Sequence, residues 1–170
     1  QGVLSTGQML ARAAMLEGKH VTYLPSYGAE VRGGTANCTV TISDEEIASP
    51  IASEPEFVVA LNQPSFFRFQ SLLQSGGCML YNSSLVDAAS VRGDIETYGI
   101  PITELASQLG NVKVANMIML GAFVAISNLV SFNKALKNLP DILGAGKAPL
   151  LKINEKAFKT GFSHVEDQKK

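Results

Sequence analysis

The chain has 170 residues and a formal net charge of −1, with 46% hydrophobic and only 17% charged residues. A chain of this length and apolar content is expected to form a single domain over residues 1–170 with an ordinary core. Charged residues are scarcer than the roughly 25% of typical globular chains, which suggests that another subunit covers part of the surface.

The charge is unevenly distributed along the chain. Residues 1–112 carry 5 basic and 11 acidic side chains, whereas residues 113–170 carry 9 basic and 4 acidic ones. A basic segment can face an acidic partner or nucleic acid, but the aromatic interleaving that is typical of nucleic-acid surfaces is absent. We therefore expect no nucleic-acid partner and interpret the basic segment as a solvated helix face.

The cysteines and histidines are too far apart to indicate a metal site. Cys38 and Cys78 are separated by forty residues, His20 and His164 are isolated, and neither C-x-x-C nor H-E-x-x-H spacing occurs. Two buried thiols in a reducing compartment are the better interpretation. With no signal peptide at its start, the sequence predicts a cytoplasmic protein that holds no metal of its own.

The first predicted element is a helix that begins after Gln1 and Gly2 and ends near Gly18, with Met9 and Ala13 at helical spacing. A glycine directly before a helix suits an anion site, because the first helical amides have no partners within the helix and the helix dipole favours negative charge there. A βαβ unit requires a strand before this helix, so the first strand of the sheet is expected to be missing from the sequence.

A glycine-rich segment, Pro25 to Gly34, separates a predicted strand over residues 20–24 from an alternating strand over residues 36–42. Its chemistry-bearing residues are Ser26, Tyr27, Arg32, Gly33 and Gly34. The donors of an arginine side chain suit carboxylate or phosphate, and the glycines allow the backbone to approach a ligand closely. An ordinary turn with a solvated charge pair is an equally good interpretation of these residue types.

Two apolar runs, residues 57–61 and 78–81, predict central parallel strands that are covered on both faces. They end in Asn62-Gln63-Pro64-Ser65 and in Asn82-Ser83-Ser84. Polar side chains thus gather at the carboxyl edge of the sheet, where open α/β sheets bind ligands. Capping of the strand ends is the alternative. The expected fold is a Rossmann-like three-layer α/β/α arrangement around a mixed, mostly parallel sheet.

The remaining predicted elements are a short strand over residues 96–100 and helices over residues 101–109, 115–130, 132–143 and 149–161, with a frayed tail from Val165. The helix over residues 115–130 is apolar on nearly all sides, but it is shorter than the ~20 residues of a membrane span. We expect no membrane contact. A helix of this kind must be buried on nearly all sides, either by its own domain or by another subunit, and we favour another subunit for part of its surface.

Several common active-site motifs are absent from the sequence. There is no G-x-S-x-G elbow and no G-x-x-x-x-G-K-[ST] phosphate loop. A dinucleotide-binding domain ends its second strand in Asp or Glu, whereas this strand runs into Leu24-Pro25-Ser26. The residues therefore support an anion site and interface-like surfaces but no self-sufficient active site.

Seven separated motifs stand out along the chain: Gln1-Gly2-Val3, Gly18-Lys19, Tyr27 to Gly34, Val40 to Asp44, Ser49-Pro50, Tyr98 to Pro101 and Asn116 to Ala122. In this order they closely resemble the gamma subunit of the 2-oxoacid:ferredoxin oxidoreductases. The resemblance covers nearly the whole chain, residues 1–130 more closely than the rest. The glycine-rich lead-in that the family usually has before Gln1 is absent.

The resemblance implies a multi-subunit enzyme that decarboxylates a 2-oxoacid, forms acyl-CoA and CO2, and passes electrons to ferredoxin. It implies that thiamine diphosphate and the iron–sulfur clusters are held by alpha, beta and delta sister subunits. This chain then holds no cofactor alone, shares coenzyme A with its partners, and is expected to form a homodimer when isolated. Residues 30–37 are most similar to 2-oxoglutarate-type members; pyruvate- and branched-chain-type members are alternatives.

We hypothesise that the chain contributes to the coenzyme A site and supplies no catalytic residue. The expected ligands are Gln1, Gly2, Ser26, Tyr27, Arg32, Gly33 and Gly34. Two other hypotheses are open: the glycine-rich segment seals the contact with the alpha subunit without touching a ligand, or the chain is a free-standing nucleotide-binding regulator.

Overall fold

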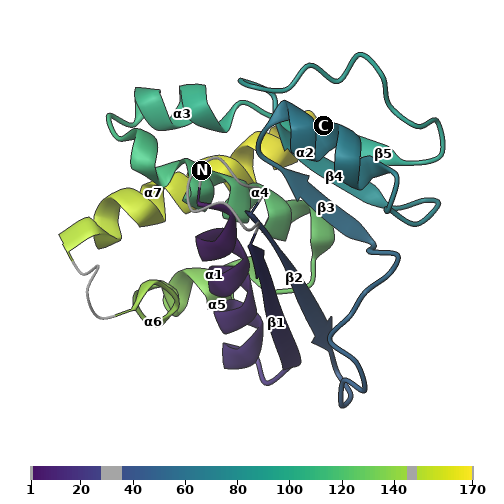
Figure 1. The fold of residues 1–170 in the computed structure, drawn as a ribbon. Coiled ribbons are helices and arrows are strands. Elements are labelled where there is room, and N and C mark those ends of the chain that lie inside the picture. The colour runs from purple at the N-terminus through teal and green to yellow at the C-terminus, as the bar shows by residue number, and fades with distance from the viewer. Residues whose placement is uncertain (1, 28–35, 145–148, 170) are drawn as a thin grey trace.

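The computed structural model describes residues 2–27, 36–144 and 149–169, in which helices and strands are mixed along the chain (Figure 1). The elements are α1 (Val3–Leu16), β1 (His20–Tyr27), β2 (Ala36–Ser43), β3 (Phe57–Ala60), α2 (Gln63–Gln70), β4 (Cys78–Asn82), β5 (Glu96–Ile100), α3 (Ile102–Gln108), η1 (Val112–Val114), α4 (Ala115–Ser127), α5 (Phe132–Lys137), α6 (Leu139–Leu143) and α7 (Leu151–Gln168).

The strands form two sheets. β3, β4 and β5 pair in parallel in that order, and β1 and β2 form an antiparallel hairpin. The predicted α/β class and the parallel pairing of the two apolar runs are confirmed. The described residues do not form one mixed sheet, however, because no backbone ladder among them joins the hairpin to β3, and the hairpin packs on α1 instead.

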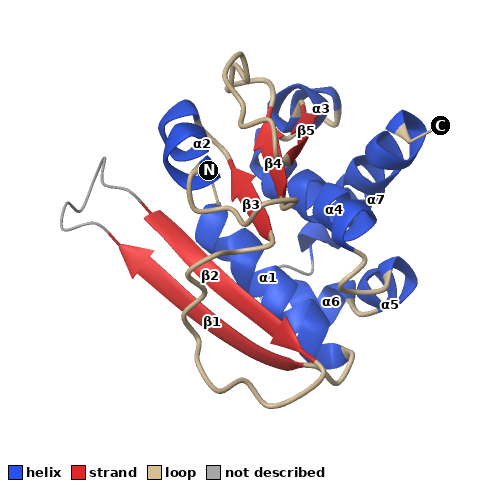
Figure 2. Cartoon of the chain, turned by 90° about the vertical axis from the view of Figure 1, so that its right-hand side faces the viewer, coloured by secondary structure: helices blue, strands red, loops and turns tan. Residues whose placement is uncertain are grey.

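Helices cover both faces of the parallel sheet, as Figure 2 shows. Adjacent residues of β4 point to opposite faces: Met79 packs with Phe66 of α2, and Leu80 packs in the larger core with residues of α3, α4 and α7. Successive side chains of a strand alternate between its faces, so a strand covered on both sides is apolar throughout. This explains the unbroken apolar run at residues 78–81.

β1 extends three residues beyond its predicted end at Leu24 and runs through Pro25 to Tyr27. Proline lacks a backbone N–H and therefore cannot complete a ladder on both sides of a strand. Among the described residues β1 pairs with β2 alone, which leaves it an edge strand, and proline is tolerated there. The predicted end of this strand at Leu24 is therefore wrong. Proline would interrupt a central strand, but β1 is an edge strand and continues through Pro25 to Tyr27.

α4 is buried by its own chain. Its residues 117–125 are all buried, α7 packs along it, and α1 and α3 add further contacts. Figure 1 shows α7 lying across α4. The expectation that another subunit covers part of this helix is therefore wrong for residues 117–125, because the long C-terminal helix of the same chain covers them.

The C-terminal part differs from the prediction in two ways. Residues 132–143 form two short helices instead of one, because Pro140 in the first turn of α6 cannot continue a helix from α5. α7 continues to Gln168, and Val165, predicted to lie in a frayed tail, is fully buried. No helix within the described ranges is long and apolar enough to span a bilayer.

Candidate functional site

The structure describes three of the seven predicted coenzyme A ligands. Gly2 precedes α1, Ser26 is exposed near the end of β1, and Tyr27 is the last residue of that strand. Outside the described residues lie the other four: Gln1, Arg32, Gly33 and Gly34. α1 begins and β1 ends at the same end of the molecule (Figure 1).

The start of α1 is built around Gly2. Its φ of 77° lies in the left-handed region that favours glycine, and a Cβ atom there would stand 3.1 Å from Asn116 Nδ2. The Gly2 carbonyl oxygen accepts hydrogen bonds from the backbone N–H of Thr6 at 2.9 Å and from its hydroxyl at 3.0 Å. The peptide that leads into the helix is therefore held in one orientation.

The first backbone amides of α1 are not capped by a side chain of the described residues. The first turn of the helix also carries no acidic residue. Uncapped first amides and the positive end of the helix dipole favour an anion at this point. The arrangement can bind a carboxylate or phosphate, but the described residues around Gly2 include no nucleophile or general base.

Side chains of the β1–β2 hairpin reach the backbone of the first turn of α1. The Tyr23 hydroxyl donates to the Leu4 carbonyl oxygen at 3.2 Å, and the Cys38 thiol lies 3.8 Å from the Val3 carbonyl oxygen. Because side chains alternate along a strand, Ser26 points to the face opposite Tyr23, away from α1. Of Gly2 and Ser26, Gly2 therefore lies directly at the helix start and Ser26 does not.

The asparagines at the carboxyl edge of the parallel sheet cap local backbone. Asn62 Oδ1 accepts the N–H of Ser65 at 3.0 Å and so caps α2. Asn82 is buried; its Nδ2 donates to Thr103 Oγ1 at 3.0 Å and its Oδ1 accepts the N–H of Ser84 at 3.2 Å. The capping interpretation of these strand ends is confirmed, and both asparagines are engaged within the chain.

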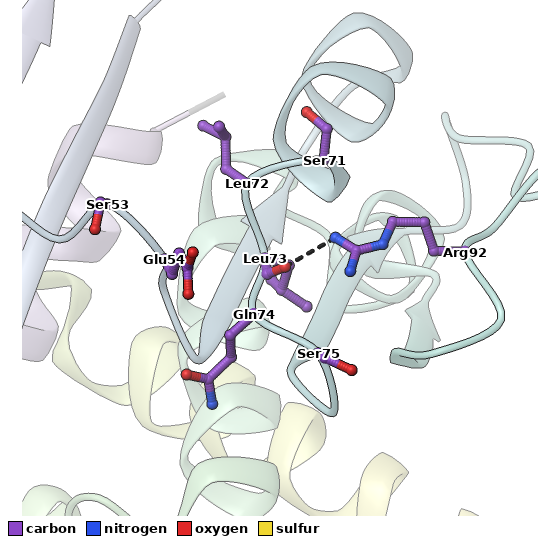
Figure 3. Close-up of a pocket in the computed structure, with 8 residues that line it drawn as sticks. All are labelled: Ser53, Glu54, Ser71, Leu72, Leu73, Gln74, Ser75 and Arg92. Carbon is purple, nitrogen blue, oxygen red and sulfur yellow. Dashed lines mark hydrogen bonds between the residues drawn. The ribbon is translucent and has the colours of Figure 1, made fainter.

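An open hollow of about 600 Å³ lies beside the C-terminal end of α2 (Figure 3). Arg92 lines it and donates through Nη1 to the carbonyl oxygens of Gln70 and Leu73, both at 2.8 Å. Its Nε and Nη2 bond the Asp94 carboxylate at 3.0 and 2.7 Å, which raises the pKa of Arg92 and lowers that of Asp94. The Asp94 carboxylate balances the charge of this guanidinium, and its donors already have acceptors within the chain. Arg92 therefore holds the C-terminal end of α2 in place and is not available to bind an anion.

The two thiols are unsuited to nucleophilic or metal chemistry. Cys78 is buried and Cys38 half-buried, and both are free. Burial raises the pKa of Cys38, and burial together with the Glu96 carboxylate raises the pKa of Cys78 to about 11. Thiols with raised pKa values stay protonated near neutral pH. Within the described part of the chain, no group of three His, Cys, Asp or Glu residues could hold a metal ion.

Sequence reasoning missed one residue of this site, Asn116. It is 114 positions from Gly2, and only the fold brings its side chain against that glycine. Asn116 could have been singled out from the sequence because it is one of the few polar residues in the apolar helix over residues 115–130 and lies at its start.

The chain is similar to known proteins over nearly its whole length. Residues 1–164 match the family described as pyruvate ferredoxin/flavodoxin oxidoreductase. Ketoisovalerate oxidoreductase subunit VorA of Methanothermobacter thermautotrophicus is 38% identical over 165 residues, which cover 95% of this chain and 33% of that protein. 2-Oxoglutarate synthase subunit KorC of Methanocaldococcus jannaschii is 34% identical over 170 residues, which cover 98% of this chain and 89% of that protein. The chain thus spans about a third of VorA but most of KorC.

The fold is also similar to that of a solved gamma subunit. The keto/oxoacid ferredoxin oxidoreductase gamma subunit from Geobacter sulfurreducens PCA superposes with a TM-score of 0.79 at 30% identity, covering 98% of this chain and 93% of that one. The resemblance seen in the sequence motifs is confirmed. The chain belongs to the pyruvate ferredoxin/flavodoxin oxidoreductase family and has the fold of its gamma subunits.

Proposed function

We propose that this chain is the gamma subunit of a cytoplasmic 2-oxoacid:ferredoxin oxidoreductase and forms one wall of its coenzyme A site. The observation that carries the proposal is the start of α1. There a left-handed glycine leads into uncapped helical amides, at the end of the molecule where β1 runs into the glycine-rich segment. In a chain of this family, such an anion site suits the phosphates of coenzyme A.

In this proposal the chain's own residues bind and orient the ligand. The amides that follow Gly2 receive a phosphate, and Arg32, outside the described residues, supplies a second set of donors. Ser26 faces away from α1, so it contacts a different part of the ligand from Gly2. Thiamine diphosphate and iron–sulfur clusters supply decarboxylation and electron transfer when bound, and we assign them to sister subunits.

The lengths of the relatives support a specific partner. The region similar to this chain makes up 33% of VorA but 89% of KorC. The same domain therefore occurs both within a longer polypeptide and as a polypeptide of nearly its own size. We propose that a sister subunit corresponding to the remaining two thirds of VorA binds this chain, alongside the other subunits and ferredoxin.

For the substrate we propose 2-oxoglutarate, because KorC matches this chain over nearly the full length of both proteins. A branched-chain 2-oxoacid is the second candidate, since VorA is 38% identical. Comparing kcat/KM of the purified complex for 2-oxoglutarate, ketoisovalerate and pyruvate distinguishes them. A preference for either of the other two acids of tenfold or more contradicts the first proposal.

The coenzyme A contact is tested with Arg32→Ala in the assembled complex. Loss of charge-assisted hydrogen bonds to a phosphate should raise the KM for coenzyme A by roughly 10- to 100-fold and leave the KM for the 2-oxoacid unchanged. Arg68→Ala, which removes an exposed arginine on α2, is the matched control and should change neither value.

Other outcomes identify the alternative functions. Loss of assembly on Arg32→Ala, with no change in the KM for coenzyme A of the complex that still forms, indicates a structural seal between subunits. Tight binding of coenzyme A or NAD to the isolated chain, measured by calorimetry, indicates a free-standing regulator. An unchanged KM in a fully assembled complex contradicts the coenzyme A proposal.

A further inference from the structure

We propose that residues 45–54, in the connection between β2 and β3, form a strap that opens and closes over the outer face of the β1–β2 hairpin. One half-buried apolar side chain holds the strap closed, and two buried hydroxyl groups without partners favour its opening. This conformational device controls access to part of the hairpin and does not depend on the proposed coenzyme A site.

The strap lies over the face of the hairpin that α1 does not cover. Figure 2 shows it passing in front of both strands, and Figure 1 shows the same segment on the side of the hairpin opposite α1. Val21 and Val40 point toward α1 and pack against the main core. Because side chains alternate along a strand, Thr22 and Thr41 point to the outer face, where the strap lies.

Few contacts hold the strap in place. Every residue of it is exposed except Ile47, which is half-buried. Its hydrogen bonds are local. The Glu45 N–H donates to Ser43 Oγ at 3.0 Å. The Ile51 N–H donates to Ser49 Oγ at 3.3 Å. Beyond these, no hydrogen bond links the strap to the rest of the described chain. A segment with so little buried apolar surface and no long-range hydrogen bonds opens at a small cost in free energy.

Two buried hydroxyl groups oppose the closed position. Thr22 and Thr41 are paired in register across the hairpin, and the Oγ1 atoms of both are buried without a hydrogen-bond partner among the described residues. A hydroxyl in this situation has lost its bonds to water and gained none in return. Lifting the strap lets water reach both groups, so each of them shifts the balance toward the open position by a factor of about five or more.

Ile47 acts in the opposite direction. It is the one side chain of the strap that is partly buried, and its apolar surface returns to water when the strap lifts. The balance between the two positions is therefore set by one isoleucine against two hydroxyl groups. In the open position the hairpin face around Thr22 and Thr41 is accessible, and in the closed position the strap covers it.

Limited proteolysis of the purified 170-residue chain measures how often the strap opens. A glutamate-specific protease binds several extended residues around its cleavage site, so cleavage after Glu46 requires Ile47 to leave the hairpin. Its rate follows the open fraction when opening and closing are fast. Thr22→Val and Thr41→Val keep nearly the same shape and remove the hydroxyl. Each should slow this cleavage about fivefold or more. Ile47→Ala should accelerate it about fivefold, because less apolar surface favours the closed position.

Two variants are matched controls. Thr39→Val makes the same replacement on the same face, at a hydroxyl that is not buried without a partner. Ile51→Ala truncates an isoleucine of the strap that is 73% exposed. Neither should change the rate by more than about twofold. Cleavage after Glu155 in α7 is followed in the same samples, because it requires that helix to unfold.

Three results overturn the strap. The first is an unchanged rate after Glu46 in both folded valine variants. The second is an equal slowing in Thr39→Val. The third is a wild-type rate after Glu46 no faster than that after Glu155, because the strap then opens only when the whole chain unfolds. Circular dichroism shows whether the variants fold. If a valine variant does not, Ile47→Ala and Ile51→Ala decide: faster cleavage in the first supports the strap, and equal rates overturn it.

Discussion

Gly121 of α4 and Gly161 of α7 each lie against the backbone of the other helix where the two helices cross. A Cβ atom on Gly121 would overlap the Phe158 carbonyl oxygen and stand 2.9 Å from its carbon. One on Gly161 would overlap the Ile118 carbonyl oxygen and stand 2.7 Å from its carbon. Helix backbone cannot move aside as the end of a flexible side chain can, so both positions require glycine. This close crossing lets one chain bury α4 by itself.

Alanine at either glycine should separate the two helices. Overpacking a core costs about 1–3 kcal/mol, and the upper end, about 3 kcal/mol, is expected here because backbone must move. The measurement is the free energy of unfolding of Gly121→Ala and Gly161→Ala from urea titration followed by circular dichroism. Gly93→Ala is the control, since no described atom lies within 4 Å of an added Cβ, and it should change stability by less than about 0.5 kcal/mol. Equal losses in all three variants contradict the packing argument.

The parts of the fold that depend on local periodicity could be predicted from the sequence. The alternation at residues 36–42 predicts β2, and the apolar runs at residues 57–61 and 78–81 predict β3 and β4 with their parallel pairing. The apolar run at residues 115–130 predicts that α4 is buried, but the element that covers it could not be predicted in this way. The packing of α7 on α4 depends on two glycines forty residues apart, and neither helix contains a signal that identifies the other as its partner.

In the candidate site, too, features set by the local sequence could be predicted and contacts set by the tertiary fold could not. The position of Gly2 directly before α1 could be predicted because glycine before a helix has a local physical meaning, whereas the contact of Asn116 with it depends on the tertiary fold. The residue types at Asn62 and Asn82 suit both ligand binding and capping. Their hydrogen bonds to Ser65 and Ser84, a few residues further on, show that they cap, and only coordinates could show this.

Glu17 joins the end of α1 to the start of α5. Its side chain is only 9% exposed, its Oε1 accepts the N–H of Ser131 at 2.6 Å, and Lys134 Nζ lies 3.6 Å from Oε2. Glu17→Ala should reduce the free energy of unfolding by about 1–2 kcal/mol, because a part-buried backbone donor at the start of α5 loses its partner. Urea titration measures the loss, and Glu45→Ala, which removes an exposed carboxylate, should be nearly neutral. Equal stability of the two variants contradicts this role for Glu17.

Gly2 and Asn116 should be energetically coupled. Gly2→Ala forces alanine into a left-handed conformation, which costs about 1–2 kcal/mol, and also brings its Cβ against Asn116. Asn116→Ala removes the contacts with Nδ2 and Cγ but keeps the one with Cβ and the backbone strain, so the double variant should recover about 0.5 kcal/mol relative to additivity. Gly110→Ala provides the control, because its φ is +81° and no described atom lies within 4 Å of an added Cβ. It should show no coupling to Asn116→Ala, and additive effects of Gly2→Ala and Asn116→Ala disprove the contact.

The raised pKa of Cys78 predicts how both thiol reactivity and stability depend on pH. Burial and the Glu96 carboxylate raise this pKa from 9.0 to about 11. Glu96→Gln removes one of the two causes, so in a Cys38→Ala background the rate of iodoacetamide labelling at pH 9 should increase, because more thiolate is present. An unchanged rate contradicts the contribution of Glu96.

The effect of the same thiol on stability has a definite sign. Between pH 9 and 11 the folded chain retains a proton on Cys78 that the unfolded chain loses, so the stabilisation present below pH 9 decreases as the pH rises through this window. Cys78→Ala should flatten the dependence of the free energy of unfolding on pH above 9, even if the alanine lowers stability at every pH. Urea titrations at pH 8, 9, 10 and 11 measure both curves. Parallel curves for the two proteins show that another group is responsible for any loss in alkali.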